Sequence, residues 1–278
     1  MPQQGAYQPP VDALLALGDP RAKEEFEPSP WRDYGALGLK ERHVSELIRM
    51  ATDEGLHDAD FDNPAVWAPL HAWRALAQLR SVEAVDPLLK LMGPRDEADD
   101  DWYLEEFPVV FGMIGPPSLS PLASYLSDSA NLLYPRAAAA GGLFHVAQHH
   151  SESRGASVAA LTDQLARFEE NPPELNAFLV CYLDDLKAVE SAEVIERAYA
   201  ARRVDESIVG SWGKIRQSLG VEGLGLAPDA PRQPSGFGLL RGARTGTPAR
   251  SQGSAQRKQR RADRKHQRHR RRKNRKRR

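Results

Sequence analysis

The residues whose types and spacing could bind a metal ion lie in two short segments. The first, DADFDN (58–63), has the D-x-D-x-D opening of a calcium-binding loop. Such a loop needs glycine at its sixth position and glutamate at its twelfth, where this chain has Asn63 and Pro69. We therefore expect no calcium site in this segment.

The second segment is a histidine cluster. His145 and His149 are four residues apart in a predicted helix, so both imidazoles could contact one metal ion. The chain offers no third ligand at a useful spacing and no H-E-x-x-H motif with its catalytic glutamate. We therefore predict no metal cofactor and a surface histidine cluster. A metal-dependent enzyme with His145 and His149 as ligands stays open as an alternative function.

The remaining chemistry-bearing residues exclude several protein classes. Cys181 is the only cysteine, so the chain can form neither an internal disulfide nor a cysteine-based zinc site. It lies in the apolar run 177–183, and we expect it to be buried and unreactive. The N-terminal residues MPQQGAYQPP have neither the basic nor the apolar region of a signal peptide, so we expect none, and no apolar run approaches the ~20 residues that span a bilayer. These features predict a cytoplasmic protein. We predict no catalytic residues, because no nucleophile elbow, dinucleotide-binding fingerprint or kinase signature appears in the sequence.

The C-terminal segment 251–278 carries the strongest functional signal. It contains fifteen Lys and Arg residues against one acid, Asp263, and has no aromatic residue. Like charges at this density prevent folding and favour phosphate backbones, so we predict a disordered tail that binds RNA or DNA with little sequence preference. The predicted polyanion-binding residues are Arg257, Lys258, Arg260, Arg261, Arg264, Lys265, Arg268, Arg270, Arg271, Arg272 and Lys273.

Acidic residues balance this tail, because the whole chain has 38 basic and 38 acidic residues. Many of them fall in the predicted loops between helix pairs, where we expect an acidic ridge for a basic partner. Its main members are Asp58, Asp60, Asp62, Asp96, Glu97, Asp99, Asp100 and Asp101. The chain's own tail is the nearest candidate partner, through an intramolecular tail–body contact. The alternative explanation is that acids at helix starts complement the helix dipole.

Helices must position these loops, because apolar residues recur at helical spacing and strand-like alternation is absent. The sequence predicts an all-α fold, an α-solenoid of about five antiparallel helix pairs with a period of 35–40 residues. The predicted pairs are 10–17 with 39–54, 64–80 with 82–92, 101–114 with 119–127, 132–149 with 156–169, and 174–186 with 191–202, followed by a last helix, 205–219. The predicted domains are a disordered arm (1–10), the solenoid (11–220), a Gly/Pro-rich linker (221–250) and the disordered basic tail (251–278).

The strings AWRALAQLRSVEAVDPLLKLM (72–92) and VFGMIGPPSLSPLASYL (110–126) resemble HEAT repeats of the short PBS-lyase type found in bacterial proteins. The segment 176–207 and the terminal Arg/Lys run are similar to parts of uncharacterised bacterial HEAT-repeat proteins that end in a basic tail. The resemblance implies a helical-repeat fold, which hosts many unrelated functions. We expect a non-catalytic scaffold that binds a protein partner through the solenoid. A lyase-like enzyme and an assembly chaperone are the alternatives.

Overall fold

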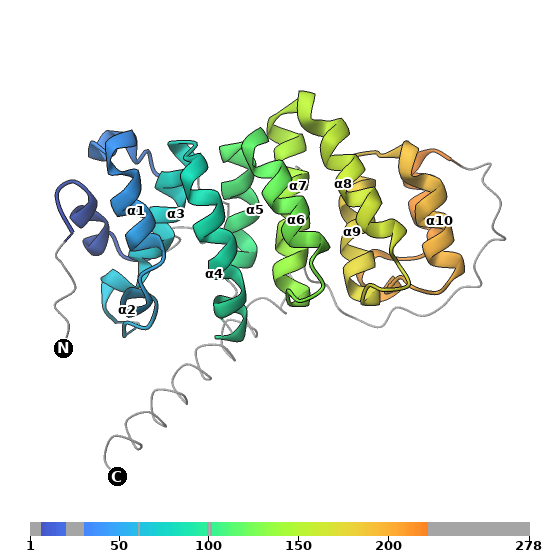
Figure 1. Ribbon diagram of the computed structural model, residues 1–278, viewed down its shortest axis with the longest axis horizontal. Coiled ribbons are helices and arrows are strands. Elements are labelled where there is room, and N and C mark those ends of the chain that lie inside the picture. The colour runs from blue at the N-terminus through green and yellow to red at the C-terminus, as the bar shows by residue number, and fades with distance from the viewer. Residues whose placement is uncertain (1–6, 21–30, 61, 99, 101, 222–278) are drawn as a thin grey trace, which may run out of the picture. The chain divides into compact units, whose positions relative to one another are not determined.

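The computed structural model describes residues 7–20, 31–60, 62–98, 100 and 102–221, all of which belong to the unit Met1–Ala230 (Figure 1). Within these residues the protein is all-helical, with twelve α-helices and eight short 3-10 helices and no strand. None of the helices in these ranges has the length and apolar character that crossing a membrane requires. The predicted basic tail and all but the first residue of the predicted linker lie outside the described residues.

The longer helices follow one another with short connections. The α-helices are α1 (Val44–Ala51), α2 (Glu54–His57), α3 (Ala68–Gln78), α4 (Val85–Glu97), α5 (Trp102–Ile114), α6 (Leu119–Ser127), α7 (Leu133–His149), α8 (Arg154–Ala166), α9 (Pro173–Asp185), α10 (Ala192–Ala200), α11 (Glu206–Val209) and α12 (Trp212–Leu219). The 3-10 helices are η1 (Val11–Ala16), η2 (Gly35–Leu37), η3 (Glu41–His43), η4 (Pro64–Trp67), η5 (Val82–Ala84), η6 (Pro116–Ser118), η7 (Ser151–Ser153) and η8 (Val189–Ser191).

The packing alternates along the chain. The odd-numbered helices contact one another in order, α1 with α3, α3 with α5, α5 with α7 and α7 with α9. The even-numbered helices do the same, α4 with α6, α6 with α8, α8 with α10 and α10 with α12. Figure 1 shows these helices following one another from α1 to α10. Every helix from α3 to α9 therefore packs both on a helix next to it in the chain and on a helix one further along.

Four of the helix-to-helix turns share one conformation, a 3-10 helix that leads directly into the next α-helix. These turns, η5 to η8, begin 34 to 38 residues apart along the chain. The third residue of each is small and buried, and these residues are Ala84, Ser118, Ser153 and Ser191. The strings LRSVEA (79–84) and LKAVES (186–191) even place a left-handed residue, Arg80 or Lys187, at the same point. A small side chain at the third position lets the turn approach its neighbours closely.

The predicted boundaries differ from the observed ones in three helices. The predicted last helix, 205–219, is two helices, because Gly210 adopts a φ of 89° between α11 and α12. The predicted helix 10–17 is only the 3-10 helix η1. In contrast, α4 continues past its predicted end at residue 92 and includes Pro94.

Aromatic side chains from neighbouring helices pack together in the core. Trp73 and Phe107 pack edge to face with ring centroids 4.7 Å apart, and Phe111 lies 5.8 Å beyond Phe107. All three are at most 2% exposed. The small residues 137–142 of α7 are buried throughout. Small side chains at these positions let the neighbouring helices pack closely on α7.

An N-terminal segment lies on α3 and is held there by polar groups. His71, only 2% exposed, bonds to the Tyr34 hydroxyl through Nδ1 (2.7 Å) and to the Gly18 carbonyl through Nε2 (2.9 Å). Gln78 accepts from the Tyr34 backbone N–H (2.9 Å) and donates to the Arg32 carbonyl (2.8 Å). Tyr7, within the predicted N-terminal arm, is also largely buried and donates to a carboxylate oxygen of Asp53.

Candidate functional site

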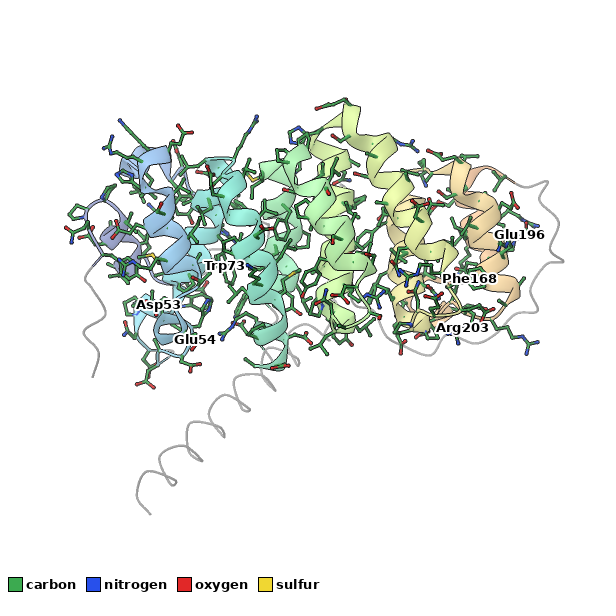
Figure 2. All side chains as sticks on the ribbon, in the orientation of Figure 1. Asp53, Glu54, Trp73, Phe168, Glu196 and Arg203 are labelled. Atoms are coloured by element: carbon green, nitrogen blue, oxygen red, sulfur yellow. The ribbon has the colours of Figure 1, made fainter. Side chains whose placement is uncertain are left out.

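The first acidic loop, residues 53–63, caps helices with some of its acids and exposes others. The Asp53 side chain accepts hydrogen bonds from the Gly55 and Leu56 amides at 2.8 and 3.3 Å, which caps α2. Figure 2 shows Asp53 beside Glu54 at the start of this helix. Asp58, Asp60 and Asp62 are exposed.

Asn63 stands where a calcium-binding loop needs glycine. Its side-chain oxygen caps η4 by accepting a hydrogen bond from the backbone N–H of Ala65 at 3.0 Å. Asn63 therefore has a role in capping the helix that follows the acidic loop. Its side-chain oxygen is engaged with the backbone of that helix.

The second acidic loop, residues 96–101, joins α4 to α5. Asp96 accepts a hydrogen bond from the Tyr103 hydroxyl at 2.6 Å, and Asp100 accepts one from the Trp102 amide at 3.3 Å. Glu97 is exposed. Asp99 and Asp101, two predicted members of the ridge, lie outside the described residues. Two acids of this loop, Asp96 and Asp100, therefore form hydrogen bonds that fix the start of α5 next to the end of α4.

A buried histidine joins the first two loops. His57 is 9% exposed, and its Nε2 lies 3.0 Å from the Ala51 carbonyl oxygen, so the ring donates there. Burial, together with the nearby charge of Arg95, lowers the pKa of His57 to about 4, against the opposing effect of Asp100 and Asp53. Residues from both loops therefore surround one neutral imidazole, and the two loops adjoin.

The later inter-pair loops are the third (128–132), the fourth (167–172) and the fifth (201–205). Burial and then the charges of Asp96 and Asp128 raise the pKa of Tyr125 to about 12, which places acids of the second and third loops around one ring. The Arg167 guanidinium donates to the Ser127 carbonyl at 3.3 Å and links the third loop to the fourth.

An arginine also joins the last two of these loops. The Arg203 guanidinium donates to the carbonyls of Glu169 (2.7 Å), Phe168 (3.3 Å) and Asn171 (3.0 Å), and it links the fourth loop to the fifth. Figure 2 shows Arg203 near Phe168. The five inter-pair loops are therefore neighbours in sequence order.

The charge along these loops is uneven. From the third loop on, arginines lie among the acids, and Arg136 (4% exposed) donates to the Leu126 carbonyl at 2.8 Å and to Asn171 at 3.3 Å. In the described part of the first two loops, Arg95 lies 3.9 Å from Asp100. The acidic excess of the body is thus concentrated at its N-terminal end.

The histidine pair lies on α7, away from these loops in the sequence. The rings of His145 and His149 are stacked, with centroids 6.2 Å apart and planes 24° apart. Burial, with a smaller contribution from His149, lowers the pKa of His145 to about 4. No group of three or more His, Cys, Asp or Glu residues in the described ranges could hold a metal ion. Cys181 is half-buried, so the prediction of a fully buried thiol was wrong.

Sequence reasoning missed one buried ion pair. Arg74 of α3 donates to both carboxylate oxygens of Glu106 of α5, at 2.8 and 2.7 Å, and both side chains are about 95% buried. The guanidinium also lies over the Trp31 ring, 4.8 Å from its centroid. The two partners are 32 residues apart, and no local pattern pairs them. This pair joins two adjacent helices to the N-terminal segment.

Comparison of the chain with protein-family models, with curated proteins and with solved structures finds no match in any of the three. The predicted polyanion-binding residues, from Arg257 to Lys273, lie outside the described residues.

Proposed function

We propose that this protein is a non-catalytic scaffold. In this proposal the body, residues 11–220, is a HEAT-like α-solenoid that binds a protein partner, and the tail, residues 251–278, binds a polyanion such as RNA, the ribosome or DNA. The observation that carries the proposal is the division of charge: fifteen basic residues and one acid in the tail, against 23 basic and 37 acidic residues in the rest of the chain.

Two features of the body support the solenoid part of the proposal. Odd helices contact odd helices and even helices contact even helices in sequence order, as expected when helix pairs stack on one another. The four turns η5 to η8 also recur every 34 to 38 residues, close to the length of a two-helix repeat unit. An array of this kind offers an extended surface to a protein partner.

The composition of the tail supports the polyanion part. Eleven of its fifteen basic residues are arginine, whose planar guanidinium forms two parallel hydrogen bonds with a phosphate. The first two acidic loops of the body would bind a basic ligand, and the tail itself is one such ligand. In that case the loops compete with nucleic acid for the tail, and both interactions weaken as salt concentration rises.

The experiment compares three full-length or near full-length proteins. These are the natural chain, a chain lacking 251–278, and a chain of unchanged length in which every Lys and Arg of 251–278 is Gln. Affinity for a labelled RNA hairpin and a DNA duplex is measured by fluorescence anisotropy at several salt concentrations. For duplex DNA we expect a log K versus log salt slope of about −0.9 for each phosphate contacted, in the natural chain only.

Far-UV circular dichroism and the melting temperature serve as the folding control, and we expect both to be nearly equal in the three proteins. Nucleic-acid binding that survives in the glutamine-tailed chain would refute the polyanion role of the tail. For the body, affinity capture is performed with and without nuclease. If the body is a scaffold, the same protein partner should be captured by the glutamine-tailed chain and by the natural chain after nuclease treatment. Loss of every captured protein in both of these experiments would contradict that role.

A further inference from the structure

Helix α7 carries two histidines on one face, one turn apart. His145 and His149 have nearly parallel rings with centroids 6.2 Å apart. His149 is exposed and His145 is half-buried. Within the described part of the chain, neither imidazole takes part in a hydrogen bond or an ion pair, so their nitrogen lone pairs are not engaged by protein groups there.

The backbone beneath His145 is fixed by close helix packing. A Cβ atom added to Gly112 of α5 would lie 2.5 Å from the Cβ of His145 and 3.0 Å from its carbonyl carbon, so only glycine fits at this point. The ring of Phe144 meets the His145 ring edge to face at 5.2 Å, and Phe144 itself stacks on Tyr182 of α9 at 5.3 Å. The position of His145 is therefore set by three helices, and His149 follows one turn later on the same rigid helix.

We propose that His145 and His149 form a two-imidazole binding site for a divalent transition metal ion of the Zn²⁺, Ni²⁺ or Cu²⁺ class, with water completing the coordination. Imidazole nitrogen is a preferred ligand of these ions, and two histidines at i and i+4 on a helix can reach one ion. This site is separate from the loops and the tail, and it does not depend on the scaffold proposal.

The two rings lie within reach of one metal ion, although their stacked orientation is not the orientation of two ligands of that ion. A metal ion sits about 2.0–2.1 Å from each imidazole nitrogen, which puts it roughly 3.2 Å from each ring centroid. Two ring centroids can then be at most about 6.4 Å apart around one ion, and the observed 6.2 Å lies within that limit. An imidazole binds a metal ion in the plane of its ring, so binding requires one ring to turn out of the stack and, for a tetrahedral ion, to come closer. We expect the exposed His149 side chain to make this rotation. A site with only two protein ligands leaves the ion exchangeable.

The test measures Zn²⁺ binding to the chelator-treated full-length chain by isothermal titration calorimetry. The ligands are identified by NMR of the ring nitrogens of His145 and His149. We expect one Zn²⁺ whose binding shifts the signals of both rings. His149→Gln, a change at an exposed position, should weaken binding by at least about tenfold, because the second imidazole then no longer binds intramolecularly. Circular dichroism checks that the variant folds.

A control variant keeps the pair and removes the two histidines of the tail, His266→Gln with His269→Gln. We expect its Zn²⁺ affinity at the α7 site to equal that of the natural chain. The proposal is overturned if His149→Gln binds Zn²⁺ as tightly as the natural chain, if the control variant loses binding, or if Zn²⁺ leaves the His145 and His149 ring signals unshifted.

Discussion

Acidification should destabilise the body through His71, the histidine that holds the N-terminal segment on α3. The Gly18 carbonyl can only accept a hydrogen bond, so Nε2 of His71 carries the proton and Nδ1 accepts from the Tyr34 hydroxyl. This arrangement requires the neutral imidazole. Burial is the main cause that lowers the pKa of His71 to about 4, from an unfolded value of 6.5.

The size of this loss of stability follows from the linkage between proton binding and folding. The folded-state pKa is below the unfolded one, so the stabilisation is present above pH 6.5 and is lost as the pH falls toward 4. A pKa difference of this size corresponds to about 3 kcal/mol in total, of which about 2 kcal/mol is lost between pH 7 and pH 5. The pKa values of His57 and His145 are also lowered to about 4, so these residues also lower the stability of the folded protein as the pH falls.

The assay separates the loss of stability caused by His71 from the loss caused by the other buried histidines. The free energy of unfolding is measured by urea denaturation at pH 7 and pH 5 for the natural chain, His71→Gln and Tyr34→Phe. At pH 7, His71→Gln should be less stable than the natural chain. The difference in unfolding free energy between the two should shrink by about 2 kcal/mol at pH 5, because the variant has no imidazole to protonate at this position. Tyr34→Phe keeps the imidazole and loses one hydrogen bond, so its deficit of about 1 kcal/mol should persist at pH 5. An equal deficit of His71→Gln at both pH values would refute the reasoning.

Two further predictions concern packing and buried charge. Gly112→Ala should destabilise the protein by about 1–3 kcal/mol in urea denaturation, because its Cβ would clash with His145, whereas Gly155→Ala on α8, with open space around it, should be neutral or stabilising by up to about 1 kcal/mol. A Gly112→Ala variant as stable as Gly155→Ala would contradict the observed packing. Arg74→Met should cost about 3–5 kcal/mol, since it leaves Glu106 buried without its partner, and adding Glu106→Leu should recover part of that loss in a double-mutant cycle. Strict additivity of the two changes would show that the pair is not coupled.

The helix pattern could be predicted where local signals and tertiary packing agree. The predicted ends of α5 and α6 match the structure, because Gly115 breaks the chain with a positive φ and prolines begin the next helix. The break at Gly210 could not be foreseen, since the apolar spacing continues across it. The continuation of α4 through Pro94 depends on the packing of residues such as Met92 and Arg95, both buried, and no local signal reports it.

The candidate site was predictable in composition but not in arrangement. The acids of the inter-pair loops can be read directly from the sequence. Which of them cap helices, as Asp53 does, depends on backbone geometry that the sequence does not specify. The ion pair of Arg74 with Glu106 and the contacts of His71 join residues 32 to 53 positions apart, so they follow only from the packing of complete helices.

The way the loops are joined differs along the body. From the third loop on, Arg167 and Arg203 connect consecutive loops by donating to backbone carbonyls, and Arg136 donates to the Leu126 carbonyl and the Asn171 side chain. The first two loops meet around His57, whose pKa of about 4 keeps it neutral near pH 7, and Arg95 lies beside it, 3.9 Å from Asp100. In the proposed scaffold, a basic ligand should favour these N-terminal loops, because the sequence places many more acids than bases in them.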